Sequence, residues 1–90
     1  SGVYALENTS EVNYAKSLLE EFEDEFKRSL SPSEMDRILN LASIYSERIV
    51  IVALNEAASY DKRDLNYIER ILISWTDKGL SVEDVENGKR

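Results

Sequence analysis

Residues 62–78 hold the side chains whose types and spacing best suggest a chemical role. Tyr67, Ile71 and Trp75 recur every fourth residue, so on an α-helix they form one ridge. Cations lie beside that ridge or just before it, at Lys62, Arg63, Arg70 and Lys78. Cations neutralise phosphates and release counterions, and an exposed aromatic ring can stack on an unpaired base. The pattern therefore predicts a nucleic-acid contact surface.

The sequence leaves two interpretations of this segment open. In the first, Tyr67 is the stacking or edge contact, Ile71 and Trp75 hold the ridge in place, and phosphates are contacted by Arg63, Arg70 and Lys78. In the second, Tyr67 and Trp75 are core residues of an amphipathic helix and the cations are ordinary solvated charge.

Composition limits the other kinds of chemistry that are available. Ninety residues make about one small domain, and the chain has no cysteine and no histidine. Disulfides, thiol nucleophiles, Cys/His zinc sites and histidine acid–base catalysis are therefore excluded. The three glycines are scattered and build no phosphate loop. No catalytic set, metal site or cofactor site can be assembled, so we expect a protein that is not an enzyme.

The formal net charge of −7 is unusual for a nucleic-acid binder, which usually carries a basic surface. DNA contact would therefore depend on a local patch, and we expect it to be weak for this chain alone. The acidic run over residues 20–25 is interpreted as the solvated face of a helix rather than a cation site. No apolar run approaches a membrane span and no signal-peptide pattern is present, so we expect a cytoplasmic location without membrane contact.

Helical periodicity extends over most of the chain. A first helix is expected over residues 9–29, and a second opens at Ser31 with a capping box and proline at its first position. The expected buried stripe of this second helix is Met35, Ile38, Leu39 and Ala42. A third helix is expected over residues 47–59, apolar nearly all round and therefore central.

A fourth helix is expected from the Asp64 cap to about Lys78, ended by a left-handed Gly79. A short fifth helix follows the Ser81 cap. The predicted fold is all-α, a compact bundle of four helices plus a short C-terminal helix. Residues 1–8 are expected to be a loose lead-in, 9–86 the helical domain, and 87–90 a frayed end. Because the chain starts Ser-Gly without methionine, we expect it to be part of a longer protein.

Four segments in series resemble motifs of the DnaD-like domain and together cover about residues 18–86. Residues 26–34 are similar to F-G-R-x-L-S-P-x-E, residues 53–57 to A-L-x-E-A, and residues 78–85 to K-G-I-x-T-x-E-x-V. The ridge of Tyr67, Ile71 and Trp75 resembles the YxxxIxxxW signature. One departure is Lys27, which stands where the family motif has glycine.

The resemblance implies a replication-initiation or primosomal protein of Gram-positive bacteria or their phages. It implies the C-terminal domain of such a protein, preceded in the family by a winged-helix domain that drives oligomerisation. Expected partners are DNA, single-stranded or duplex, and replication proteins such as a helicase loader, for which the family acts as a scaffold. The alternative is a protein–protein interaction domain that contacts helicase, loader or itself without touching DNA. Its surface would be the acidic face of the first helix or an exposed Ile73.

Overall fold

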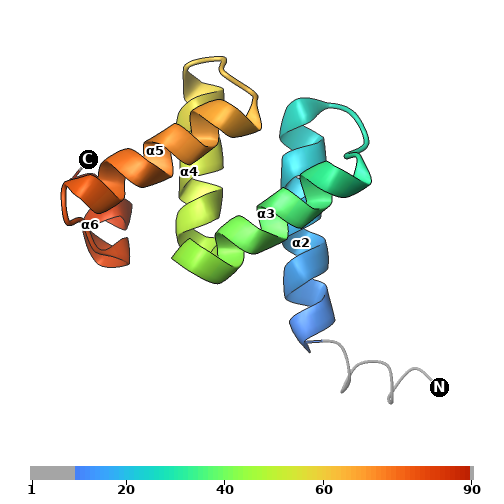
Figure 1. Cartoon of the computed structure of the whole chain (residues 1–90), viewed down its shortest axis with the longest axis horizontal. Helices are drawn as coiled ribbons and strands as arrows, with labels where there is room; N and C mark the ends of the chain where they lie inside the picture. The colour runs from blue at the N-terminus through green and yellow to red at the C-terminus, as the bar shows by residue number, and fades with distance from the viewer. Residues whose placement is uncertain (1–9, 90) are drawn as a thin grey trace.

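Five α-helices make up the part of the chain that the computed structural model describes, residues 10–89 (Figure 1). They are α2 (Ser10–Phe26), α3 (Pro32–Tyr45), α4 (Glu47–Ser59), α5 (Leu65–Asp77) and α6 (Val82–Glu86). The predicted all-α class, with four longer helices and one short one, is confirmed. The expected lead-in over residues 1–8 lies outside the described residues, and the domain boundaries stay predictions.

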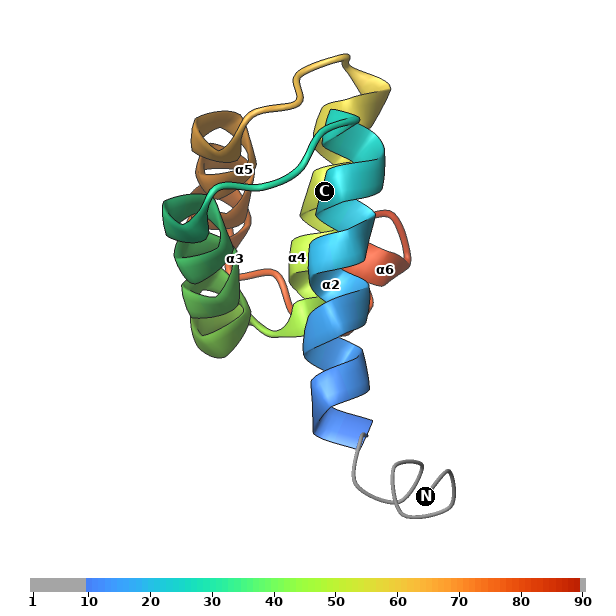
Figure 2. The same cartoon turned by 90° about the vertical axis from the view of Figure 1, so that its right-hand side faces the viewer.

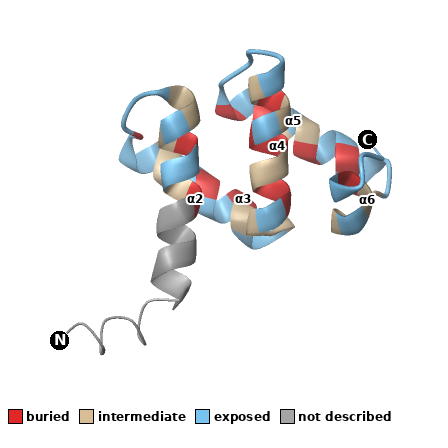
Figure 3. Ribbon diagram, turned by 180° about the vertical axis from the view of Figure 1, so that it is seen from behind, coloured by how far each residue is buried: buried red, intermediate tan, exposed pale blue. Residues whose placement is uncertain are grey.

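Helix α4 is the centre of the domain because it packs against each of the other four helices. Four of its side chains are fully buried, Val50, Ala53, Leu54 and Ala57. Figure 2 shows α3 and α5 in one layer, with α2 and α4 beside each other in a second. Figure 3 shows the buried residues gathered on the sides where these helices meet. The central position of α4 follows from its own sequence, which is apolar on nearly all sides of the helix.

The predicted helix caps are confirmed in the structure. The Ser31 hydroxyl accepts a hydrogen bond from the Glu34 backbone N–H, and the Glu34 carboxylate accepts one from the Ser31 N–H. Ser81 and Asp84 form the same reciprocal pair at α6. Gly79 has a φ of 70°, as expected of a residue that ends a helix.

Two predictions about the first two helices are wrong. Helix α2 ends at Phe26 rather than at residue 29, because Lys27 adopts a left-handed φ of 58°. In α3, Leu39 is 39% exposed and Leu41 is 3% exposed, so Leu41 takes the core position that was predicted for Leu39. Leu39 and Leu41 lie on opposite sides of the buried Ile38 around the helix axis. Because α3 packs against α2, α4 and α5, its buried face includes Leu41 and leaves Leu39 exposed.

Within the described helices, no single one is long and apolar enough to cross a membrane. The pair α3 and α4 reaches the required length and apolarity only when taken together, and the two are bent by 119°.

Candidate nucleic-acid interface

Helix α5 is positioned by a cap at its start and by one buried face. The Asp64 carboxylate accepts a hydrogen bond from the Tyr67 N–H at 3.0 Å, which starts the helix at Leu65. The buried residues of α5 pack on the core: Leu65, Ile68, Leu72 and Trp75. Tyr67 and Ile71 are only partly buried, so they form the edge between the core and the surface.

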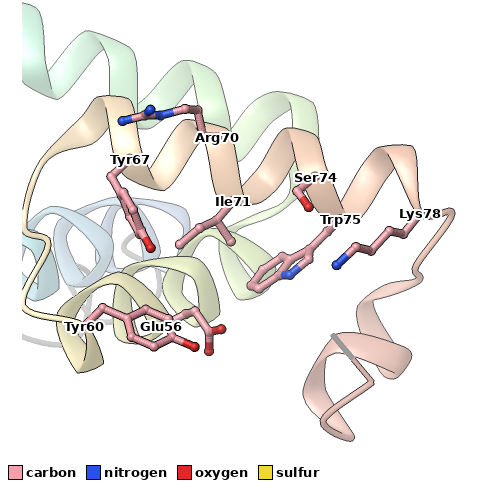
Figure 4. Close-up of a pocket in the computed structure, with 8 residues that line it drawn as sticks. All are labelled: Glu56, Tyr60, Tyr67, Arg70, Ile71, Ser74, Trp75 and Lys78. Atoms are coloured by element: carbon pink, nitrogen blue, oxygen red, sulfur yellow. The ribbon is translucent and has the colours of Figure 1, made fainter.

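A groove lies between α4 and α5, with a volume of about 300 Å³, and we call it the α4–α5 groove (Figure 4). Its α5 side is lined by Tyr67, Arg70, Ile71, Ser74, Trp75 and Lys78. Its α4 side is lined by Glu56 and Tyr60. One groove therefore joins the whole Tyr-Ile-Trp ridge to two of the predicted cations.

Tyr67 and Arg70 interact directly within this groove. The Arg70 guanidinium carbon lies 5.8 Å from the centre of the Tyr67 ring, which is cation–π distance. Figure 4 shows the Tyr67 ring extending from α5 toward α4, and the Arg70 side chain extending from α5 on the side away from α4. The contact limits the freedom of both side chains and holds a positive charge beside an aromatic surface.

Five of the seven sequence-predicted residues line the groove, and Lys62 and Arg63 do not. Lys62 is exposed in the loop before α5. Arg63 forms ion pairs with Glu25, at 3.5 Å, and with Asp61. The pair with Glu25 connects the α4–α5 loop to helix α2, and the pair with Asp61 lies within the loop.

Trp75 lies deepest among the ridge residues. It is 4% exposed, so it supports the groove from below and presents little surface to a ligand. Tyr67 is less buried than Trp75, and both pack with the core. Trp75 is therefore a core residue, and Tyr67 lies at the rim of the groove.

The α4 side of the groove was missed by sequence reasoning. Tyr60 is 59% exposed and stands at the end of α4, just beyond the helix expected over residues 47–59. The available signal was an aromatic residue between two expected helices, which by itself does not say what it faces. Glu56 was part of the A-L-x-E-A match and was given no role.

The charges of the groove are divided between its two sides. Arg70 and Lys78 lie on the α5 side, and Glu56 lies on the α4 side. An anion is therefore favoured along α5 and disfavoured along α4. No group of three or more Asp or Glu side chains in the described part of the chain is arranged to hold a metal ion.

The family model for replication initiation and membrane attachment matches residues 19–88. The chain belongs to this DnaD-like family. It is 38% identical over 76 residues to the replicative helicase loading/DNA remodeling protein DnaD of Bacillus subtilis (strain 168). The match covers 82% of this chain and 32% of that relative, so this DnaD-like domain spans about a third of the relative's length. No solved structure gives a significant match.

Proposed function

We propose that this DnaD-like domain is a DNA-binding and scaffolding module of a bacterial or phage replication-initiation protein. The α4–α5 groove is its DNA-contact surface. The observation that carries the proposal is the grouping of Tyr67 with Arg70 and Lys78 in one groove of a chain whose net charge is −7. Cations gathered beside an aromatic ring suit a ligand that has both phosphates and flat bases.

Each groove residue has a distinct part in this proposal. Arg70 and Lys78 contact phosphates, and Tyr67 contacts a base by stacking or by its edge. Ile71 and Trp75 hold Tyr67 in place from the core side. Lys62 adds positive potential before the helix, and Arg63, through its pairs with Glu25 and Asp61, fixes the loop that leads into α5.

The scaffolding part of the proposal rests on family membership. The matched Bacillus relative is named for helicase loading and DNA remodeling. We extend that role to this domain, with a helicase loader and other replication proteins as partners in the cytoplasm. Oligomerisation would come from another domain of the intact protein, and the role is that of a scaffold rather than an enzyme.

The test is fluorescence anisotropy of labelled single-stranded and duplex oligonucleotides, titrated with this chain at two salt concentrations. Tyr67→Ala should weaken binding about 5-fold to 100-fold while the domain stays folded. Lys78→Ala should make the negative slope of log affinity against log salt less steep by about 0.7 on single strands, because one phosphate contact is lost. Lys27→Ala is the matched control, since Lys27 is an exposed cation that does not line the groove. Lys27→Ala should bind like the wild type. If Tyr67→Ala and Lys78→Ala also bind like the wild type, the groove is not the DNA-contact surface.

A second candidate function is a protein–protein interaction domain without DNA contact. The observations that favour it are the exposed Ile73, at 45%, and the exposed acidic residues Glu20, Glu21 and Asp24 on α2. An apolar residue and an acidic face suit a protein partner better than a phosphate backbone. Under this alternative, the chain binds neither oligonucleotide in the titration, even at low salt.

A further inference from the structure

Tyr60 combines a fixed backbone with an exposed ring. It is the C-cap residue of α4, and its N–H donates to the Ala57 carbonyl at 3.1 Å. The chain then reverses through Asp61, whose φ is 59°, and the Lys62 N–H donates to the same Ala57 carbonyl at 2.9 Å. The attachment point of the ring is therefore set by the helix end, while 59% of the residue remains exposed. An aromatic ring that is held at a groove and left exposed is a candidate contact for another flat group.

The α4–α5 groove has an aromatic residue on each of its two sides. Figure 4 shows Tyr60 at the end of α4 and Tyr67 on α5 across from it, with Ile71 next to Tyr67 along α5. The Arg70 guanidinium carbon lies 5.8 Å from the centre of the Tyr67 ring, so Arg70 already covers part of the surface of that ring. The groove volume of about 300 Å³ is at the lower end of the range for small-ligand pockets. A single nucleobase, which is flat and apolar on both faces, suits a groove of this size and lining.

The distribution of charge sets the orientation of a bound strand. Arg70 and Lys78 lie on the α5 side, so the phosphates follow that side. Glu56 gives the α4 side a negative charge, which disfavours phosphate there. The base attached to such a phosphate then extends across the groove from α5 toward Tyr60. In a duplex, the faces of each base are covered by its neighbours, so only an unpaired base can enter in this way.

Building on the proposed function, we propose that Tyr60 is an additional DNA-contact residue that forms the second aromatic side of a base-binding groove with Tyr67. The ligand is an unpaired base of a single strand whose phosphates lie along Arg70 and Lys78. The groove thereby selects single-stranded over duplex DNA.

The experiment compares Tyr60→Ala and Tyr60→Phe with the wild-type chain by anisotropy. Three labelled ligands are used: an oligothymidylate, an abasic strand with the same number of phosphates, and a duplex. Tyr60→Ala should weaken binding to the oligothymidylate about 5-fold to 100-fold, and Tyr60→Phe should retain wild-type binding because stacking needs the ring and not the hydroxyl. On the abasic strand, wild type and Tyr60→Ala should bind alike, since no base is present to stack.

The controls separate a binding effect from a folding effect. Thermal unfolding by circular dichroism should show a folded Tyr60→Ala variant, since Tyr60 is largely exposed. Ile44→Ala removes a side chain that is 62% exposed on α3 and does not line the groove. Ile44→Ala should bind the oligothymidylate like the wild type.

The outcomes distinguish this inference from the proposed function. If Tyr60→Ala binds the oligothymidylate like the wild type while Tyr67→Ala binds more weakly, Tyr60 is no contact residue and the proposed function stands. An equal loss on the oligothymidylate and the abasic strand also overturns the inference, because the effect would not involve a base. If the wild-type chain binds none of the three ligands, the proposed function fails and the inference fails with it.

Discussion

Lys27 occupies a backbone position that favours glycine. Its φ of 58° lies in the left-handed region, where an L side chain costs about 1–2 kcal/mol. The DnaD-like motif has glycine at this position, and the turn between α2 and α3 shows why. The Lys27 N–H donates to the Glu23 carbonyl at 2.7 Å, and the Glu23 carboxylate accepts from the Leu30 N–H at 3.1 Å. These bonds keep the left-handed turn in place although the residue is a lysine.

Lys27→Gly should therefore stabilise the domain by about 1 kcal/mol, because the relief of strain exceeds the entropy that glycine adds to the unfolded chain. Urea unfolding followed by circular dichroism measures the change. Lys27→Ala is the matched control, since it removes the same charge and keeps the Cβ atom. Equal unfolding free energies for the glycine and alanine variants would show that backbone strain is not the cause.

The start of α3 is held by a charge-assisted capping box. Two nitrogens of Arg28 donate to the two carboxylate oxygens of Glu34, each at 2.8 Å. The Arg28 guanidinium, followed by the Ser31 N–H, lowers the pKa of Glu34 to about 2 from its ordinary value of 4.5. Because the folded pKa lies below the unfolded one, this stabilisation is fully present above pH 4.5 and is lost as the pH falls toward 2.

Glu34→Gln should lower the melting temperature at neutral pH, and the difference from the wild type should shrink as the pH falls from 4.5 to about 2. Glutamine keeps an acceptor for the Ser31 N–H and loses the charge that pairs with Arg28. Thermal unfolding across this pH range measures the effect. Glu21→Gln, at an exposed position on α2, is the control. A constant difference between wild type and Glu34→Gln at all pH values would rule out the Arg28–Glu34 pair as its source.

Helix boundaries were predictable where the signal is local. Ser31, Asp64 and Ser81 each cap the helix that the sequence assigns to them, since a cap involves only neighbouring residues. The end of α2 was not predictable, because the left-handed turn is made at a lysine. The exchange of Leu39 for Leu41 in the core depends on how α3 packs against three other helices, and a periodic pattern does not contain that information.

In the whole molecule, the candidate site is made by the packing of α4 against α5. The α5 half, with Tyr67, Arg70 and Lys78, was predictable because these residues follow one helical period. The α4 half was not predictable, because Glu56 belongs to a helix that the sequence marks as core and Tyr60 lies just beyond the end predicted for that helix. The groove therefore concentrates an aromatic and cationic surface on one side of an acidic domain.

Binding of DNA in the α4–α5 groove can be observed residue by residue. We would record the backbone amide spectrum of the isotopically labelled chain during titration with a single-stranded oligonucleotide at low salt. We expect the amide signals of the groove residues Tyr60, Tyr67, Arg70, Ser74 and Lys78 to shift. We expect no shifts at Glu20, Glu21 and Asp24 on α2 or at Ile44 on α3. Shifts confined to the acidic face of α2 or to the surroundings of Ile73, or no shifts at all, would rule out DNA binding in the groove and favour the protein-interaction alternative.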